Sequence, residues 1–135
     1  MAKVNTKNTK KIVKKKTVNN VTEHGKVFIT STFNNTLVTV TNDKGDTLGW
    51  SSAGAKGFKG ARKSTPYAAS LAVEDVVKKL IDKGLKTADI YIKGPGNGRD
   101  SSLRGIKSAG LQIVSISDVT PQPHNGPRPK NKRRV

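Results

Sequence analysis

Both ends of this chain are unsuited to packed regular structure, and this restricts the fold to the residues between them. The first 24 residues contain seven lysines and one acidic residue, Glu23. The last 16 residues, 120–135, contain five cations and no acid, and their prolines at 121, 123, 127 and 129 are incompatible with a regular helix or strand. We expect a basic, disordered N-terminal extension over 1–24, one compact domain over 25–119, and a basic, proline-rich C-terminal tail over 120–135.

The net charge is concentrated in these two ends. The chain has 26 Lys and Arg against 9 Asp and Glu, a net charge of +17, of which residues 25–119 supply only +6. Charge of one sign repels itself in a monomer, whereas on a polyanion each neutralised phosphate releases condensed counterions. A solvated tail that only aids solubility is the alternative. Cations at both ends favour nucleic acid as the partner.

Several classes of protein are excluded by what the sequence lacks. No run of 18 apolar residues is present, so no segment is long enough to span a membrane. The first 24 residues lack the apolar core of a secretory signal, and the chain has no cysteine. We therefore expect a cytoplasmic protein without disulfides, thiolate chemistry or a cysteine-ligated metal.

The first half of the predicted domain is typical of three antiparallel strands. Apolar and polar residues alternate over 27–33 and again over 36–41, and a third strand is predicted over 47–52. The Asn34–Asn35 pair forms the first turn because asparagine tolerates left-handed backbone angles, and residues 42–46 form the second. The three strands make a meander.

A helix with clear ends follows. Thr65 can cap its N-terminus, Pro66 suits the first helical position, and Gly84 ends it. Apolar residues at helical spacing fill one face. The pairs Glu74–Lys78 and Asp75–Lys79 place opposite charges four residues apart on the other face, which predicts a helix that packs on a sheet and exposes its charged side.

The remaining segments complete an α/β pattern. A strand is predicted over 87–95, a short helix over 101–109, and a last strand over 111–119 that is rich enough in Ile, Val and Leu to be buried. The element order is β-β-β-α-β-α-β. Because the last two crossovers imply parallel pairing with helices on the sheet faces, we predict a single α/β layer domain with a mixed five-stranded sheet.

Two glycine-rich loops, 54–65 and 94–105, have the composition of phosphate-binding loops, but neither completes an enzyme motif. Gly96 and Gly98 give the start of a dinucleotide fingerprint, yet Ser101 stands where the third glycine is required. In the earlier loop no glycine is followed directly by Lys and then Ser or Thr, as a P-loop demands.

A nuclease is the enzymatic alternative, because three antiparallel strands followed by helix and strand is the order of ribonuclease H-like folds. Members of that class cut nucleic acid with clustered carboxylates and two metal ions. The acids here are badly placed: Asp43 and Asp46 fall in a turn, Asp118 lies at a strand end, and none is predicted mid-strand. The histidines, His24 and His124, lie in the predicted extensions and are interpreted as incidental. We predict no catalysis and no metal site.

The later loop could instead hold the phosphates of a polymer. Glycine lets successive N–H groups point to one side and lets an anion approach closely. A helix that begins at Asp100 or Ser101 carries partial positive charge at its start, with Arg99 before it and Arg104 and Lys107 after it. A glycine-rich connector with merely exposed arginines is the alternative.

The earlier loop repeats this arrangement with three glycines and four cations between residues 54 and 63. Phe58, its single aromatic residue, could stack on an unpaired base or pack in its own domain, and the sequence leaves both open. Both loops follow the C-terminal ends of predicted strands, so we expect them at the same edge of the sheet.

Three long motifs then resemble one known family. They are "ITSTFNNTLVTVTN" over 29–42, "GAKGFKGARKSTPYAA" over 54–69, and "GPGNGRDSSLRGIKSAGLQIVSISDVTPQPHNGPRPKNKRRV" over 94–135. In this order they closely resemble the universal small-subunit ribosomal proteins numbered eleven, of bacterial type. The resemblance covers about residues 20–135.

The resemblance implies a ribonuclease H-like fold without catalysis, which binds 16S rRNA on the platform of the small subunit. It further implies neighbouring platform proteins, mRNA nearby, a role in folding the rRNA and in shaping the cleft for the mRNA/anti-Shine–Dalgarno duplex, and no cofactor or small-molecule substrate. The residues to which it assigns rRNA contact are Lys56, Lys59, Arg62, Lys63, Gly96, Asn97, Arg99, Arg104, Lys107, His124, Asn125, Arg128, Lys130, Lys132, Arg133 and Arg134.

The resemblance also implies a modification. In bacterial relatives the asparagine of the "PHNG" motif, here Asn125 before Gly126, is found as isoaspartate. Pro127 stands where a cysteine is common in the family. The alternatives to an rRNA-binding protein are the nuclease above and a generic basic protein that compacts DNA.

Overall fold

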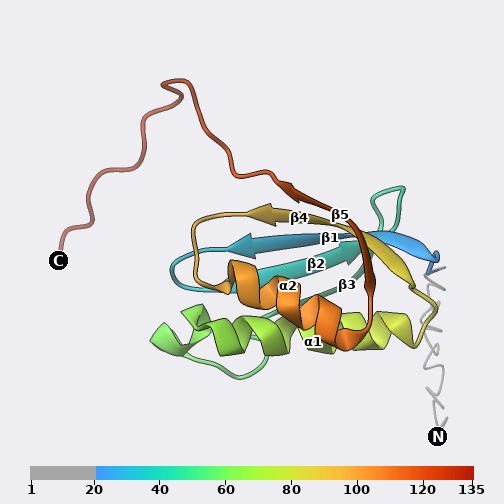
Figure 1. Cartoon of the computed structure of the whole chain (residues 1–135). Helices are drawn as coiled ribbons and strands as arrows, with labels where there is room; N and C mark the ends of the chain where they lie inside the picture. Colours follow the sequence, from blue (N-terminus) through green and yellow to red (C-terminus); the bar gives the residue numbers. More distant parts are fainter. Residues whose placement is uncertain (1–20) are drawn as a thin grey trace, which may run out of the picture.

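Five strands form one mixed sheet, in the order β3-β2-β1-β4-β5 (Figure 1). The computed structural model describes residues 21–135. The strands are β1 (His24–Ser31), β2 (Thr36–Thr41), β3 (Thr47–Ser52), β4 (Thr87–Lys93) and β5 (Gln112–Asp118); the helices are the 3-10 helix η1 (Gly60–Ser64), α1 (Pro66–Ile81) and α2 (Gly98–Ala109). β2 pairs antiparallel with β1 and β3, whereas β4 is parallel to both β1 and β5. The prediction of a mixed five-stranded α/β sheet is confirmed.

The folded domain starts earlier than the predicted boundary at residue 25. Val21 packs against the core, and the carbonyl oxygen of Glu23 accepts hydrogen bonds from the N–H groups of Lys86 and Thr87. His24 is already the first residue of β1. Residues 21–24 therefore belong to the domain, and residues 1–20 of the predicted extension lie outside the described part of the chain.

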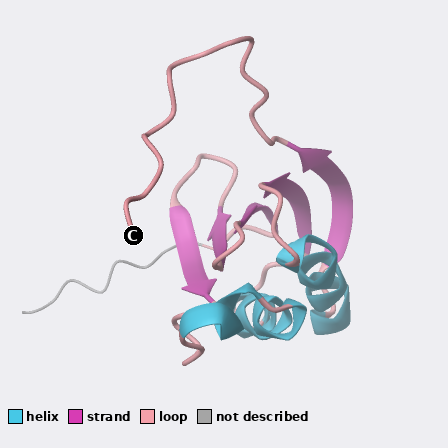
Figure 2. Ribbon diagram, turned by 90° about the vertical axis from the view of Figure 1, so that its left-hand side faces the viewer, coloured by secondary structure: helices cyan, strands magenta, loops and turns pink. Residues whose placement is uncertain are grey.

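Both helices cover the same face of the sheet (Figure 2). In β1 the side chains of Val27 and Ile29 are buried against them, while Phe28 between the two points to the other side and is 39 % exposed. The crossovers had predicted helices on the sheet faces; here one face carries both α1 and α2 and the other carries none. We call the uncovered side the open face.

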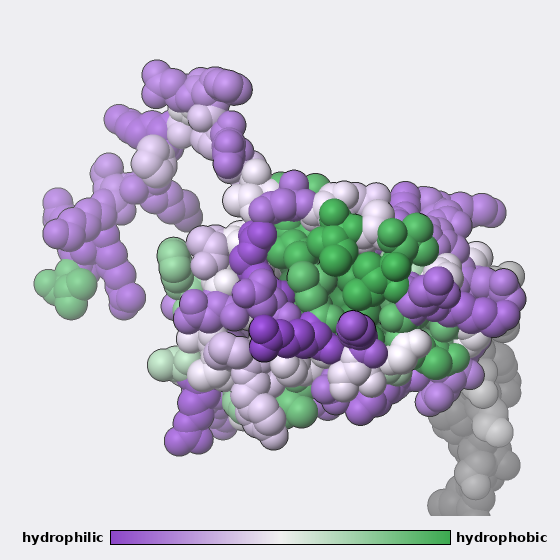
Figure 3. All heavy atoms as spheres, in the orientation of Figure 1, coloured by the Kyte–Doolittle hydropathy of each residue, from purple (hydrophilic) through white to green (hydrophobic). Residues whose placement is uncertain are grey.

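β5 is an edge strand, and the prediction that it would be buried is wrong. Val114 and Ile116 are 62 % and 55 % exposed, and apolar side chains gather on this side of the molecule between β5 and α2 (Figure 3). The run of branched residues suited a central strand, but β5 pairs on one side only, with β4. β-branched residues favour the extended backbone at an edge as well as in the centre.

α1 has the ends that its sequence predicts. Thr65 accepts a hydrogen bond from the N–H of Ala68, and Pro66 is the first helical residue. The helix ends at Ile81, and Gly84 adopts a φ of +115° in the turn that follows. The ion pairs Glu74–Lys78 and Asp75–Lys79 form at 3.0 and 2.8 Å, so the charged outer face is confirmed.

The loop between β4 and α2 packs directly on the end of β1, and its glycines make this possible. A Cβ atom placed on Gly94 would lie 2.2 Å from the carbonyl oxygen of Ser31. A Cβ on Gly96 would lie 2.4 Å from the carbonyl oxygen of Thr32, and one on Gly98 would lie 2.3 Å from Oγ1 of Thr36. A side chain at Gly94 or Gly96 would require the backbone of residues 31 and 32 to move, and one at Gly98 would meet the side chains of Thr36 and Ala69.

Replacing Gly94 with alanine is therefore expected to destabilise the domain by about 3 kcal/mol. The change combines a left-handed backbone cost of about 1–2 kcal/mol, since Gly94 has a φ of +99°, with a steric conflict that costs about 1–3 kcal/mol. Chemical denaturation would measure the free energy of unfolding.

Gly45→Ala is the matched control. Gly45 has a φ of +97°, but nothing lies within 4 Å of an added Cβ atom. We expect this variant to lose about 1 kcal/mol from the backbone cost alone. Equal losses in the two variants would contradict the close packing of Gly94 on Ser31.

Candidate nucleic-acid interface

Four strands end at the same edge of the sheet, which brings the candidate loops together. β1, β4 and β5 are parallel, and β3 runs in the same direction because β2 is antiparallel to both β1 and β3. The segments that follow these strands define what we call the carboxyl edge: residues 32–35, 53–65, 94–97 and 119–135. In Figure 1 the arrowheads of β1 and β4 point toward it. The two glycine loops thus share an edge, as predicted.

Charge is distributed unequally between the two edges of the sheet. The loop over 53–65 contains four cations and no acid, and the tail over 119–135 contains five cations and no acid. At the opposite edge, the four acids Asp43, Asp46, Asp82 and Glu23 are nearly balanced by three lysines, Lys44, Lys83 and Lys86. The carboxyl edge is the basic side of the described domain.

The loop over 53–65 owes its shape to two glycines and a short helix. Gly57 and Gly60 have φ values of +91° and +60°, and nothing lies within 4 Å of an added Cβ atom at either. η1 then places Arg62 and Lys63 in its last turn, and the hydroxyl of Thr65 donates to the carbonyl oxygen of Arg62. Arg62 is exposed and Lys63 is half-buried. These glycines serve the turns, so the space around them stays open.

Lys56 is committed to a partner within the protein. Its Nζ lies 3.1 Å from Oδ1 of Asp75, whose other oxygen is 2.8 Å from Lys79. Hydrogen bonds from Lys79 and then from Lys56 hold the pKa of Asp75 below its usual value. Of the four cations in this loop, Lys56 is therefore the one paired with an acid, and it shares that carboxylate with Lys79.

Phe58 packs against its own domain. Its ring is half-buried and meets the ring of Tyr67 edge to face, with the centroids 6.1 Å apart and an interplanar angle of 85°. The sequence left open whether Phe58 stacks on a base or on protein, and the structure places it on Tyr67 at the start of α1.

The loop over 94–97 uses its glycines for a different purpose than the sequence indicated. The close approach that glycine permits is made by the chain itself, since the buried Gly96 donates its N–H to the carbonyl oxygen of Ser31 at 3.0 Å. α2 begins at Gly98 rather than near Ser101, and the Gly98 N–H donates to the Ser31 hydroxyl at 3.2 Å. The reasoning that these glycines make room for an anion is therefore wrong, whereas Asn97 beside them is exposed.

Arg99 binds the start of the tail. Its guanidinium donates to the carbonyl oxygen of Gly94 and to Oδ2 of Asp118, both at 2.7 Å, and lies 3.4 Å from Oγ1 of Thr120. Asp118 was predicted to be alone at a strand end, and it is instead paired. The Thr120 hydroxyl and then Arg99 hold the pKa of Asp118 well below its usual range. Arg99 thus fixes where the tail leaves the sheet.

The other predicted contact residues are all exposed. Arg104 and Lys107 lie on the outer side of α2. Beyond residue 120 the tail contains no helix or strand and every residue from 121 onward is exposed, including His124 and the five cations. Asn125 has a φ of 54°, the left-handed conformation that asparagine tolerates.

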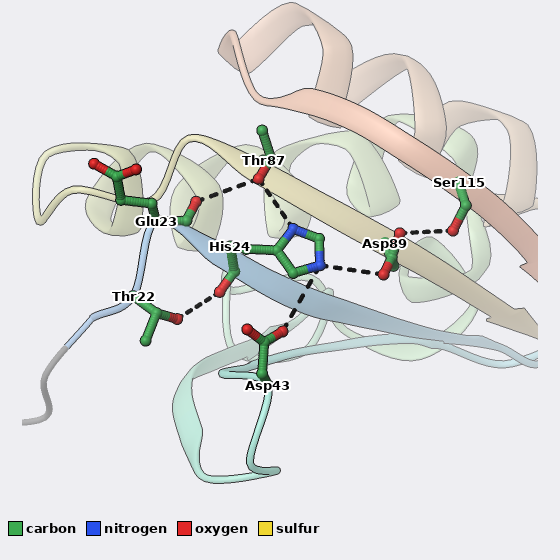
Figure 4. Close-up of polar contacts among 7 residues, drawn as sticks. All are labelled: Thr22, Glu23, His24, Asp43, Thr87, Asp89 and Ser115. Carbon is green, nitrogen blue, oxygen red and sulfur yellow. Dashed lines mark hydrogen bonds and ion pairs between the residues drawn. The ribbon is translucent and has the colours of Figure 1, made fainter.

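A polar network lies at the opposite end of the sheet, and two sequence interpretations fail there (Figure 4). His24 is not in a loose extension: its Nε2 lies 3.2 Å from Asp89 and its Nδ1 lies 3.0 Å from the Thr87 hydroxyl. Asp89 lies inside β4, although no acid was predicted mid-strand. Ser115 donates to Asp89 at 2.7 Å and, with His24, lowers the pKa of that carboxyl.

This network joins neighbouring strands through side chains. Asp43 lies 3.7 Å from His24, so the β2–β3 turn, β1, β4 and β5 are linked through two side chains. Within residues 21–135 no three His, Asp or Glu side chains are grouped so that they could hold a metal ion. Among the same residues, no helix has the length and apolar character needed to cross a membrane.

The sequence matches the family described as ribosomal protein S11 over residues 25–134. The chain belongs to the ribosomal protein S11 family. The match spans the whole sheet from β1 onward, both helices and nearly all of the tail. Membership makes this a ribosomal protein of the small subunit that binds rRNA, and the family is a structural rather than an enzymatic kind.

Sequence reasoning missed several exposed residues of this S11 family member. Phe33, at the tip of the β1–β2 turn on the carboxyl edge, is 75 % exposed. Trp50 and Leu37 lie on the open face and are 66 % and 46 % exposed. The exposure of Leu37 and Trp50 could have been predicted from the alternation in the strands, because it placed large apolar residues on both sides of the sheet.

Arg99→Ala is expected to loosen the start of the tail. The N–H of Gly94 donates to Thr120 Oγ1, and the N–H of Thr120 donates to Asp118, so both amides depend on the group that Arg99 holds. We expect hydrogen exchange at these two amides to speed up by about tenfold. Lys83→Ala, an exposed cation after α1, should leave them unchanged; unchanged rates in Arg99→Ala would contradict this role.

The same contact should weaken in acid. Because the folded pKa of Asp118 is lowered, its ionised form stabilises the protein fully above the ordinary aspartate pKa of about 3.9, and this contribution is lost as the pH falls from there toward the folded pKa. NMR titration of the carboxyl should show a higher midpoint in Arg99→Ala. An unchanged midpoint would mean that Thr120 alone lowers the pKa.

Proposed function

We propose that this protein binds 16S rRNA on the platform of the small subunit through its carboxyl edge and tail. The observation that supports this most directly is the charge distribution. The segments after four strands meet at one edge and carry nine cations and no acid over 53–65 and 119–135, while acids and lysines nearly balance at the other edge. Phosphates are neutralised at such a surface, and the released counterions drive binding.

The way RNA is recognised follows from the residues available. At the carboxyl edge Lys59, Arg62 and the tail cations are exposed, whereas Phe58 is packed on Tyr67. Apart from the exposed ring of Phe33 on the β1–β2 turn, the edge therefore presents positive charge to a folded sugar–phosphate backbone, and we infer that it reads the shape of the RNA more than its bases. We further propose that the protein lies beside other platform proteins and near mRNA, in ribosomes of the cytoplasm. There it helps to shape the cleft for the mRNA/anti-Shine–Dalgarno duplex. The ribonuclease H-like classification stays a prediction.

The two alternative functions, a nuclease and a DNA-compacting protein, predict different observations. A nuclease needs carboxylates free to hold magnesium, but Asp89, the acid inside a strand, is bonded to Ser115 and His24. A generic DNA-compacting protein should bind duplex DNA as well as rRNA, with the same salt dependence. Co-sedimentation with the small subunit followed by crosslink mapping separates both from the proposal, since only an rRNA-binding subunit protein should crosslink at one defined rRNA region.

Removing residues 128–135 should reduce the salt dependence of rRNA binding. Each lost phosphate contact lowers the slope of log K against log salt by about 0.7–0.9, so the five cations in this segment can account for a change of at most about 4. Filter binding at several salt concentrations would measure the slope.

A variant with the same five cations replaced by glutamine is the control for chain length, and it should behave like the truncation. Lys83→Gln, after α1 and away from the carboxyl edge, should not change the slope. If the truncation leaves the slope unchanged, the tail does not bind phosphates and this part of the proposal fails.

We also propose that Asn125 is converted to isoaspartate. Attack of the Gly126 nitrogen on the side-chain carbonyl carbon forms a succinimide and releases ammonia, and hydrolysis of the ring then gives aspartate or isoaspartate. Gly126 adds no side chain to hinder the attack, and both residues are exposed. Peptide mass analysis that separates the two isomers tests this; unmodified asparagine in assembled particles would contradict it.

A further inference from the structure

The open face of the sheet carries a row of aromatic side chains. The strand registers place Tyr91 of β4 beside Phe28 of β1, Phe28 beside Thr39 of β2, and Thr39 beside Trp50 of β3. These four residues therefore form one row that crosses four strands at right angles. Neighbouring strands are about 4.8 Å apart, so the row presents three aromatic rings over about 14 Å.

Two of the three aromatic rings of this row are stacked on each other, and two are exposed. Phe28 and Tyr91 are stacked on each other with their centroids 5.2 Å apart and their planes 15° from parallel. Phe28 is 39 % exposed and Trp50 is 66 % exposed, because neither helix lies on this side (Figure 2). Because Thr39 is smaller than the rings of Phe28 and Trp50 on either side of it, the row is lower at Thr39 than at its neighbours.

Cations lie on both sides of the aromatic row. Lys26 is two residues before Phe28 on the same strand face, and Lys93 is two residues after Tyr91. Asp89, the acid on this face, is already hydrogen-bonded to His24 and Ser115. Lys93 ends β4, so the row is continuous with the carboxyl edge, where the family's rRNA contact is proposed above.

We propose that the open face binds unpaired bases of RNA by stacking, with Lys26 and Lys93 on the phosphates. Sheets that carry exposed aromatic residues on adjacent strands bind two or three bases in this way, because every base has a face that stacks. This deepens the proposed rRNA-binding function and depends on it. The carboxyl edge grips the backbone of folded RNA, and the open face takes bases that are not paired.

The chemistry of the row favours RNA over another protein. The exposed apolar residues of β5, Val114 and Ile116, are aliphatic and offer no ring to stack on a base. The open face has three rings, threonines between and beside them, one exposed aliphatic residue, Leu37, and a lysine on each side of the row. This composition complements a chain of flat bases joined by negative phosphates.

The chain's single tryptophan makes the test direct. Full-length protein is titrated with a short single-stranded oligouridine and with an abasic ribose-phosphate chain of the same length, while Trp50 fluorescence is followed. We expect the oligouridine to quench Trp50 and to bind about tenfold more tightly than the abasic chain. Equal affinity for both, or no quenching, would overturn the proposal.

Variants of the stacked pair test the surface itself. Phe28→Ala with Tyr91→Ala should reduce the affinity for oligouridine by about tenfold or more and leave the affinity for the abasic chain unchanged. Phe28→Tyr with Tyr91→Phe keeps two rings and should retain binding. Val114→Ala, at an exposed apolar residue of β5 outside the row, is the control. A fold defect would weaken binding of both chains, so it is distinguishable from loss of stacking.

Two further outcomes separate this inference from the proposed function. Arg62→Ala with Lys63→Ala should lower the salt slope of rRNA binding yet keep base-dependent quenching of Trp50. If the slope falls but no base-dependent quenching is seen, the open-face proposal fails alone. If size-exclusion chromatography shows a dimer that the Phe28→Ala, Tyr91→Ala variant disperses, the face binds a second copy and the proposal is wrong.

Discussion

The packing of the Gly94–Gly98 loop on the end of β1 is the contact on which the carboxyl edge depends. Two N–H groups of this loop are donated to Ser31, one to its carbonyl oxygen and one to its hydroxyl. These two hydrogen bonds fix the loop against β1, and α2 starts directly after it. Arg99, in the first turn, then points back to Gly94 and reaches Asp118. A single set of contacts thus leads from β1 to the place where the tail leaves the sheet.

This arrangement divides the cations of the carboxyl edge into two kinds. Arg99 is paired with Asp118, and Lys56 shares Asp75 with Lys79, so both cations are held by contacts within the protein. Among residues 21–135, Arg62 and Lys59 make no ion pair with an acid, and the same is true of the tail cations. A count of lysines and arginines therefore overestimates how much positive charge the loops offer to a partner. It underestimates the fraction of the unpaired positive charge that the tail carries.

Much of the fold could be predicted from the sequence, because local patterns determine it. The alternation over 36–41 and the capping residues around Pro66 depend on neighbours in the chain, and the structure has these elements where they were expected. The carboxyl edge could also be predicted, since strand direction follows from the order of elements. Patterns of this kind need no knowledge of distant contacts.

The errors concern contacts between residues far apart in the sequence. His24 and Asp89 are 65 residues apart, and only the parallel pairing of β1 with β4 makes them neighbours. The partner of Arg99 is 19 residues away, at the end of an edge strand. A glycine-rich loop has the same composition whether it surrounds an anion or a turn of its own protein. For that reason the purpose of Gly96 could not be predicted from the sequence.

The one-sided sheet has a consequence for how the protein can bind. A sheet covered on one face normally turns polar residues to the other, yet Phe28, Trp50 and Tyr91 lie there across four strands. Stacking of Phe28 on Tyr91 removes part of their apolar surface from water and restricts their rotamers before any partner arrives. Side chains that are already ordered lose less conformational entropy on binding. The Phe28–Tyr91 pair of the open face is therefore preorganised for a partner, whereas every residue of the tail from 121 onward is exposed.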